Sequence, residues 1–193
     1  MTVRGVFLLL VCAWIARAQT SAKSHYLRAI ELLRNQNPSE AVVELDEALK
    51  MEPQFPEAHH AKGLARLAES NPAAALSEFR RAIQLKPSLA EAHLGLGLAL
   101  GQSAELEPAA AEFRSALRIR PDYAEAHKRL GITLRRLGKE ESALAEFQAA
   151  VKCDGADPEA WYNLGLAQKS AGDNAAAIDS FQDRKSTRLN SSH

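Results

Sequence analysis

Residues 57–63 read EAHHAKG, and closely related stretches follow at a constant step of 34 residues. Residues 91–97 read EAHLGLG, residues 125–131 read EAHKRLG, and residues 159–165 read EAWYNLG. A fixed period of this length is typical of stacked-repeat proteins, in which one structural unit is copied along the chain. We therefore interpret the chain as successive copies of one unit.

Other positions of the unit keep the same step. An alanine column consists of Ala41, Ala75, Ala109, Ala143 and Ala177. A column of large apolar residues consists of Leu45, Phe79, Phe113, Phe147 and Phe181. The units close on Pro53, Pro87 and Pro121, with Gly155 at the fourth closure. These columns resemble the tetratricopeptide repeat family, whose pattern is a large residue followed by Gly, Ala, an aromatic residue, Ala and Pro.

The resemblance covers roughly residues 22–182. It implies an all-α fold, a right-handed superhelical α-solenoid of stacked helix-turn-helix repeats. The expected units are 22–55, 56–89, 90–123, 124–157 and an incomplete unit 158–182. The first unit departs most from the pattern, with Ala29 where later units have glycine. This departure is expected of a terminal repeat, which packs against one neighbour only.

Within each unit, apolar residues recur at helical spacing, which predicts two helices per unit. Asn37 before Pro38 is typical of a helix start, and Glu40 is expected to complete a capping box with Asn37. The recurring glycines and alanines predict that the two helix backbones of a unit approach closely. Cys153 falls in an apolar column, so we expect it to be a small core residue, with a reactive thiol as the alternative.

Residues 1–18 have the organisation of a secretory signal. Arg4 supplies a basic start, residues 5–15 an apolar core, and residues 16–18 a small-x-small cleavage site. The apolar core is shorter than the ~20 residues that span a bilayer comfortably. We therefore expect export to the periplasm or the outside, with no membrane span after signal cleavage, rather than anchoring by an uncleaved signal.

Residues 183–193, DRKSTRLNSSH, break the repeat: Arg184 stands in a column otherwise occupied by alanine. This tail resembles translated read-through of a sequencing adapter. We expect it to be non-native and the native protein to continue beyond Gln182; a natural polar tail is the alternative. The uncapped end is expected to favour self-association.

The chain has 24 basic and 24 acidic residues. Five of the basic residues and one acidic residue lie in the two end segments 1–18 and 183–193, so 19 basic and 23 acidic residues remain between them, a net charge of about −4. This mildly acidic balance argues against nucleic acid as the main partner, because nucleic-acid-binding domains usually present a basic face.

Two columns resemble functional sites. Histidines recur at His25, His59, His93 and His127, and glutamates at Glu57, Glu91, Glu125 and Glu159. Equivalent residues of stacked repeats lie about 8–10 Å apart and point the same way, so the histidines are not expected to converge on a metal. Because Trp161 shares their column, we interpret it as a packing slot for a bulky ring. The glutamates fall in first helical turns, where they complement the helix dipole; recognition of a basic ligand is the alternative.

No nucleophile with a histidine relay, no acid–base pair and no phosphate loop is recognisable, so we predict no enzyme activity for the residues present, no cofactor and no metal. In tetratricopeptide arrays, first-helix side chains line a concave groove. Carried over to this chain, the candidate groove residues are Tyr26, Ile30, His60, Leu64, Leu94, Leu98, Lys128, Ile132, Arg135, Tyr162, Leu166 and Lys169. The alternative is that the apolar candidates pack into the core of the repeats.

The fourth unit also gathers five cations: Lys128, Arg129, Arg135, Arg136 and Lys139. We expect them to favour an acidic partner; the alternative is that they only form a solvated face. Ile132 stands where chaperone-tail adaptors of the family need an asparagine, which argues against that ligand. The resemblance and the signal-like residues 1–18 together imply an exported scaffold that binds a protein or peptide through its concave face. The alternative is the N-terminal repeat region of a larger exported enzyme or envelope-assembly factor.

Overall fold

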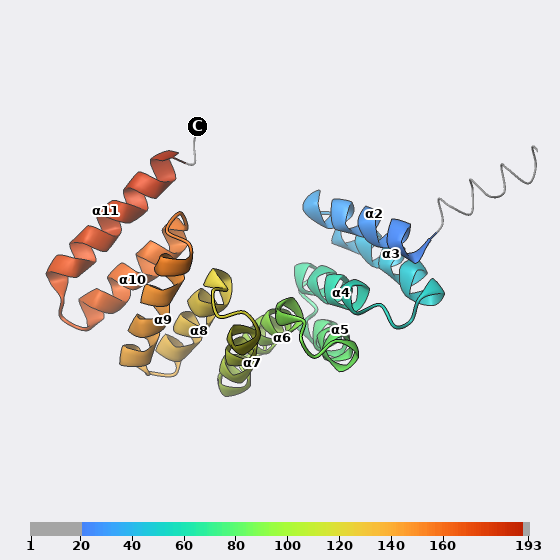
Figure 1. The fold of residues 1–193 in the computed structure, drawn as a ribbon, viewed down its shortest axis with the longest axis horizontal. Helices are drawn as coiled ribbons and strands as arrows, with labels where there is room; N and C mark the ends of the chain where they lie inside the picture. The colour runs from blue at the N-terminus through green and yellow to red at the C-terminus, as the bar shows by residue number, and fades with distance from the viewer. Residues whose placement is uncertain (1–20, 191–193) are drawn as a thin grey trace, which may run out of the picture. The chain divides into compact units, whose positions relative to one another are not determined.

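The structure is a computed structural model that describes residues 21–190, with side chains described through Arg184. Within this range all regular secondary structure is α-helical (Figure 1), which confirms the predicted all-α fold of paired helices. The expected signal segment, residues 1–18, lies outside the described residues. None of the described helices is sufficiently long and apolar to cross a membrane.

The helices alternate between a first and a second helix of each pair. The first helices are α2 (Ala22–Arg34), α4 (Pro56–Ala68), α6 (Ala90–Gln102), α8 (Ala124–Arg136) and α10 (Pro158–Ser170). The second helices are α3 (Pro38–Met51), α5 (Pro72–Leu85), α7 (Leu106–Ile119), α9 (Glu140–Cys153) and α11 (Asn174–Asn190). Both sets begin at a constant step of 34 residues, the same step that the sequence shows.

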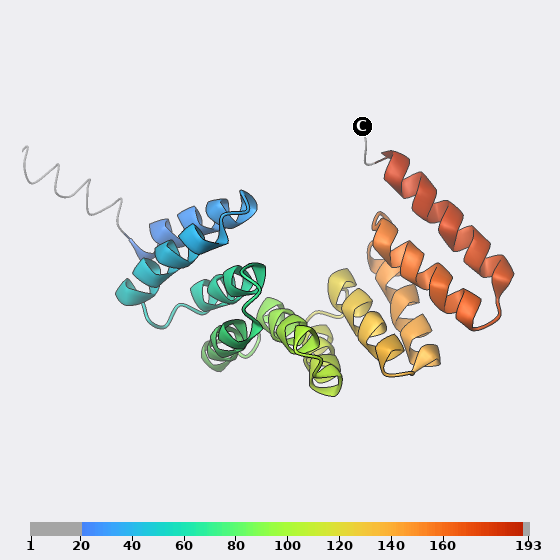
Figure 2. The ribbon, with the colours of Figure 1, turned by 180° about the vertical axis from the view of Figure 1, so that it is seen from behind.

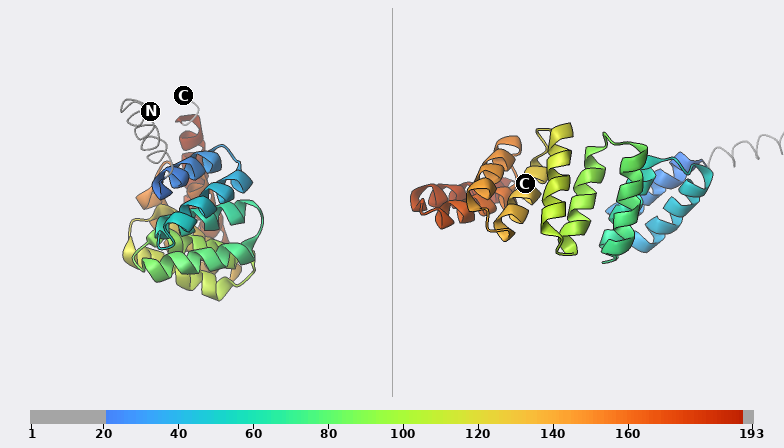
Figure 3. Two further views of the ribbon diagram at one scale, coloured as in Figure 1. Left: turned by 90° about the vertical axis from the view of Figure 1, so that its right-hand side faces the viewer. Right: turned by 90° about the horizontal axis from the view of Figure 1, so that it is seen from below.

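The described residues form two compact units, which are divided between Pro87 and Ser88. In the described part of the first unit, α2 packs against α3, α3 against α4, and α4 against α5 (Figure 2). In the second unit, consecutive helices from α6 to α11 pack in the same way, and the first helices α6 and α8 also touch (Figure 3). Each unit is therefore a row of antiparallel helix pairs.

The turn inside each helix pair contains one residue with a positive φ angle. These residues are Gln36 (59°), Ser70 (58°), Ala104 (61°), Gly138 (73°) and Gly172 (85°). The left-handed conformation reverses the chain after a first helix and favours glycine, which the last two pairs use. The other three pairs hold a side chain in the same strained turn.

The glycine column of the first helices lies against the aromatic column of the second helices. A Cβ atom on Gly63 would lie 2.6 Å from Phe79 Cε1, and one on Gly131 would lie 2.7 Å from Phe147 Cε1. The predicted close approach is therefore present, but the group that requires it is an aromatic ring rather than the facing backbone. In the first pair, Ala29 and Leu45 replace the glycine and the ring, and both are fully buried.

Two local predictions were wrong. The Asn37 side chain makes no capping hydrogen bond, so the expected capping box with Glu40 is not formed. The equivalent Asn71 does accept a bond from the Ala74 amide at 3.1 Å. The backbone angles of the two asparagines are nearly the same, so only the side-chain orientation differs.

Cys153 is exposed rather than part of the core. It is the last residue of α9, and the equivalent residues Met51 and Ile119 are also the last of their helices. These two side chains are 49% and 37% exposed, and Leu85 at the end of α5 is partly exposed, so the column lies at the helix ends and not in the core. Apolar composition alone did not reveal this position.

Candidate partner-binding surface

Each histidine of the repeated column binds a glutamate of the next helix. The pairs, Nδ1 to Oε2, are His25–Glu44 (2.6 Å), His59–Glu78 (2.7 Å), His93–Glu112 (2.7 Å) and His127–Glu146 (2.7 Å). The histidine side chains are only 13–20% exposed. Each pair joins a first helix to the second helix of the same repeat, which gives these residues a structural role.

The second ring nitrogen explains why tryptophan shares this column. His59 Nε2 lies 3.2 Å from the Pro53 carbonyl oxygen, and His127 Nε2 lies 2.9 Å from that of Pro121. Trp161 Nε1 donates to the equivalent Gly155 carbonyl at 2.9 Å. At these three positions the column therefore supplies a ring N–H to the end of the preceding unit. Across the described part of the chain, no three His, Cys, Asp or Glu side chains gather as a metal site.

Two glutamates of the other repeated column are paired with cations at the end of the same repeat. Glu57 Oε1 accepts a bond from Lys86 Nζ at 2.7 Å, and this bond lowers the pKa of Glu57. Glu91 Oε1 accepts a bond from Arg120 Nη1 at 2.9 Å. All glutamates of the column lie in first helical turns, where the helix dipole favours negative charge. These two carboxylates are thus already neutralised within the chain.

Lys128, one of the candidate groove residues, is only 5% exposed. Its Nζ lies 2.9 Å from Glu125 Oε2, 2.7 Å from Asp157 Oδ2 and 2.8 Å from Glu159 Oε2. Burial alone would lower the pKa of Lys128, but the three carboxylates outweigh it and raise the pKa. Lys128 therefore joins α8 to the start of α10 and does not present its charge on an open surface.

Leu94 is also buried, with 8% exposure, so it belongs to the core alternative. The remaining candidates are partly or largely exposed: Tyr26, Ile30, His60, Leu64, Leu98, Ile132, Arg135, Tyr162, Leu166 and Lys169. Leu64 and Tyr162 are the more exposed apolar members, at 36% and 39%. Their role in binding a partner stays a prediction.

Aromatic contacts fix several of these side chains. The His60 ring lies 5.8 Å from the Phe79 ring, and the Tyr162 ring lies 6.0 Å from the Phe181 ring, between centroids. The Tyr26 ring lies 5.0 Å from that of Phe55. Each of these contacts restricts the ring of a candidate residue within its own helix pair or between neighbouring repeats.

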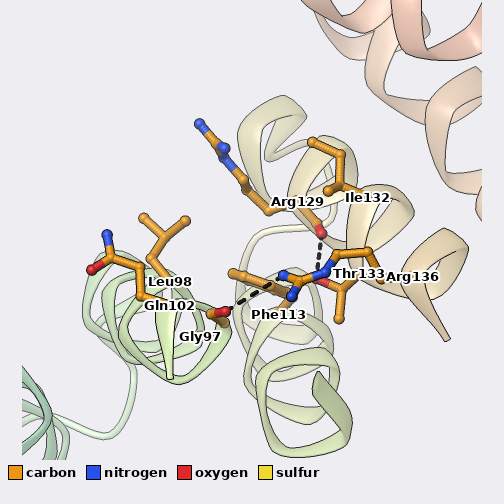
Figure 4. Close-up of a pocket in the computed structure, with 9 residues that line it drawn as sticks. Gly97, Leu98, Gln102, Phe113, Arg129, Ile132, Thr133 and Arg136 are labelled. Atoms are coloured by element: carbon orange, nitrogen blue, oxygen red, sulfur yellow. Dashed lines mark hydrogen bonds between the residues drawn. The ribbon is translucent and has the colours of Figure 1, made fainter. Parts of the chain in front are cut away.

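A pocket of about 340 Å³ lies between the neighbouring first helices of the second unit (Figure 4). Its lining residues are Gly97, Leu98, Gly101, Gln102, Phe113, Arg129, Ile132, Thr133 and Arg136. Leu98 and Gln102 come from α6, whereas Ile132 and the two arginines come from α8. The pocket brings together two of the candidate groove residues, Leu98 and Ile132.

The polar groups of this pocket differ in how far they are already engaged. Arg129 Nε donates to Glu125 Oε1 at 2.6 Å, and the Thr133 hydroxyl donates to the Arg129 carbonyl at 2.8 Å. Arg136 Nη1 reaches only the Gly101 carbonyl, at 3.4 Å. Arg136 is exposed and has no carboxylate within salt-bridge distance among the described residues. The pocket therefore combines an apolar wall with one uncompensated cation.

The cation cluster predicted for the fourth unit separates into two groups. Lys128 and Arg129 have carboxylate partners inside the chain. Arg135 donates to Asn163 Oδ1 at 3.3 Å, and its guanidinium lies 5.7 Å from the Phe147 ring. Arg135, Arg136 and Lys139 have no carboxylate partner among the described residues and therefore retain net positive charge.

Comparison with known proteins identifies the repeat. A family model described as "Tetratricopeptide repeat" matches residues 26–90 and again residues 60–124. A second model, described as "TPR repeat", matches residues 131–172. No curated protein matches the chain in sequence.

Several solved structures share the fold. The structure titled for the functional characterization of Pseudomonas aeruginosa pilF has a TM-score of 0.81 at 18% identity, over 86% of this chain and 76% of that chain. MamA (41-end) from Desulfovibrio magneticus RS-1 has a TM-score of 0.74 at 22% identity, over 88% and 96%. YrrB, described as a TPR protein with an unusual peptide-binding site, has a TM-score of 0.68 at 18% identity, over 92% of each chain. Identities this low establish the fold alone.

Proposed function

Because the chain belongs to the tetratricopeptide repeat family, we propose that it is an exported scaffold that binds a segment of another protein through its first helices, without chemistry of its own. Proteins built from this repeat serve as scaffolds for protein–protein interaction. The observation that carries the proposal is the pocket between α6 and α8, because it lies among the side chains expected to line the groove.

The size and lining of this pocket suit a peptide. Small-ligand sites typically measure about 300–1,000 Å³ and combine apolar walls with a few polar groups. The volume here is about 340 Å³, and the partly exposed Leu98 and Ile132 stand on its two sides. An extended segment that crosses both helices would place a side chain between them. The likeness to YrrB, which is described as having a peptide-binding site, supports a ligand of this class.

A displayed library of short random peptides tests this proposal. We expect peptides selected on the wild-type protein to bind the double variant Leu98→Glu, Ile132→Glu at least about tenfold more weakly, because buried carboxylates would replace apolar contacts. The matched control is Val43→Glu, Ile119→Glu, which adds the same charge at exposed positions of second helices. Circular dichroism would verify that all variants keep their helix content.

Two results would contradict the proposal. One is that no peptide is enriched on the wild-type protein. The other is that the selected peptides bind the Leu98, Ile132 variant as tightly as they bind the control.

A further inference from the structure

We infer that the pocket beside Gly101 receives an apolar side chain from a partner segment whose neighbouring acidic side chain pairs with Arg136. This inference rests on the proposed function and adds the chemistry of the ligand. Three features of the pocket support it: the origin of its free space, its apolar walls and the charge at its rim.

The free space exists because one repeat lacks a side chain. The column that contains Gly101 consists of Leu33, Leu67, Gly101, Arg135 and Lys169. A Cβ atom built on Gly101 would meet no atom within 4 Å. By contrast, a Cβ on Gly97, in the same helix, would lie 2.5 Å from Phe113 Cε1. Packing therefore requires the glycine at Gly97. Gly101 instead leaves an open volume, because every other repeat has a side chain in this column.

The walls of that volume favour an apolar group. The Phe113 ring, which is 2% exposed, lines the pocket from α7. Leu98 and Ile132 flank it from the two first helices, as Figure 4 shows. Burying an apolar side chain against such walls is favourable by about 25 cal/mol per Å². A polar group placed against the Phe113 ring would lose water without gaining a partner from that ring.

The rim carries the specificity for an acid. Arg129 is engaged by Glu125 at 2.6 Å, but Arg136 makes only one long hydrogen bond, to the Gly101 carbonyl. A carboxylate that replaces this contact would form a charge-assisted and potentially bidentate bond, which is about twice as strong as a neutral one. Arg136 is also exposed, so such a bond needs no rearrangement of the helices.

The carboxylate belongs to a side chain of a continuous segment, not to a chain terminus. A terminal carboxylate held inside the pocket would need donors there, but the Thr133 hydroxyl already donates to the Arg129 carbonyl. Two donors left for a ligand, Arg136 and Gln102, come from opposite helices, and Arg129 is already paired with Glu125 through its Nε. A segment that crosses the pocket can meet Arg136 with a side chain while its neighbour enters the apolar space.

The test uses peptides from the displayed library, resynthesised with acetylated N-termini and amidated C-termini so that no terminal carboxylate is present. We expect an enriched motif with a bulky apolar residue near Glu or Asp. Replacing that acidic residue by its amide should weaken binding to the wild-type protein about tenfold, the loss of one charge-assisted bond. Arg136→Gln should weaken binding to the acidic peptide equally, but should leave binding of the amide peptide unchanged.

Gly101→Leu is the decisive variant, because Leu67 shows that the repeat accepts leucine at this position. The variant should fold at least as stably as the wild type, since glycine is unfavourable inside a helix, yet lose at least tenfold in affinity for the peptide. Arg114→Gln, an exposed arginine of α7 outside the pocket, is the control and should bind normally.

The outcomes separate this inference from the proposed function. Two results would overturn the inference and leave the proposed function standing. In the first, the selected peptides fail to bind the Leu98, Ile132 variant but lack acidic residues. In the second, they fail to bind that variant but bind Gly101→Leu normally. The absence of any selected peptide would overturn both. Peptides that need a free C-terminal carboxylate to bind would also overturn the inference.

Discussion

The ring of Phe147 lies so close to Gly131 that a Cβ atom on the glycine would stand 2.7 Å from Phe147 Cε1. The same relation joins Gly63 to Phe79 at 2.6 Å, although these residues belong to the other compact unit. In the first helix pair, Ala29 occupies the glycine column and adds a methyl group there, while Leu45 occupies the aromatic column in place of the ring. The two columns therefore vary together, which indicates that the volume shared by the two helices is held constant.

Gly131→Ala is expected to destabilise the protein by about 1–3 kcal/mol, because the added methyl group forces the Phe147 ring or the helix to move. Phe147→Leu should also destabilise it, because it leaves part of the core unfilled. The double variant reproduces the Ala29–Leu45 arrangement and should be less destabilised than the sum of the single variants. Chemical denaturation of all four proteins measures the coupling, and strictly additive effects would show that the two columns do not share space.

A second double-mutant cycle tests the histidine column. In the last helix pair, Trp161 replaces the histidine and Ser180 stands where the other pairs have the bonded glutamate. Glu146→Ser alone should destabilise the protein by about 1.5–3 kcal/mol, since it leaves His127 Nδ1 without its carboxylate. Adding His127→Trp should restore part of the loss, because the indole can still donate to the Pro121 carbonyl. Equal unfolding free energies for the single and double variants would contradict this account.

The buried Lys128 predicts a strong and pH-dependent effect. Lys128→Met should destabilise the protein by about 3 kcal/mol at neutral pH, because three carboxylates lose their shared cation. This is the lower end of the range for broken buried pairs, since Glu159 and Glu125 remain 51% and 34% exposed. Lys139→Met, at an exposed lysine of the same repeat, is the control and should change stability by less than about 0.5 kcal/mol.

The direction of the pH dependence follows from both partners. Burial would raise the pKa of Asp157, but the Lys128 bond outweighs it and lowers the pKa. The stabilisation from Asp157 is therefore present above its unfolded pKa of about 3.9 and is lost as the pH falls through the lower folded value. The raised pKa of Lys128 keeps its contribution intact below its unfolded pKa of about 10.4. The difference between wild type and Lys128→Met should thus be constant from about pH 5 to 9 and shrink in stronger acid; a difference that grows in acid would be inconsistent with the ion cluster.

Export is tested by the N-terminus of the mature protein. When the full chain is expressed in a bacterium, mass spectrometry of the exported fraction should find a protein that begins at Gln19, because the small-x-small site ends at Ala18. Ala18→Arg should block this cleavage, whereas Thr20→Ser, just beyond the site, should not. An uncleaved wild-type chain that stays in the membrane would favour the anchored alternative.

The regular part of the fold was predictable, because one packing solution is copied at a fixed step: both helices of every pair begin where the repeat places them. The histidine column was predicted as a packing slot, but its glutamate partners, 19 residues further along the chain, were missed, because the sequence does not show which side chains of the two helices touch. The burial of Lys128 was not predictable, because its three partners lie on α8 and at the start of α10, and only the packing of these helices brings them together. The pocket arises from Gly101, a single departure from the repeat, so the repeat pattern did not predict it.

The most direct test of the central claim, that partners bind along the first helices, is backbone hydrogen exchange with and without a selected peptide. Binding should slow exchange in residues 90–102 and 124–136, the helices on the two sides of the pocket, while the exposed ends of α7 and α9 keep their rates. Protection confined to the second helices, with α6 and α8 unchanged, would contradict the claim.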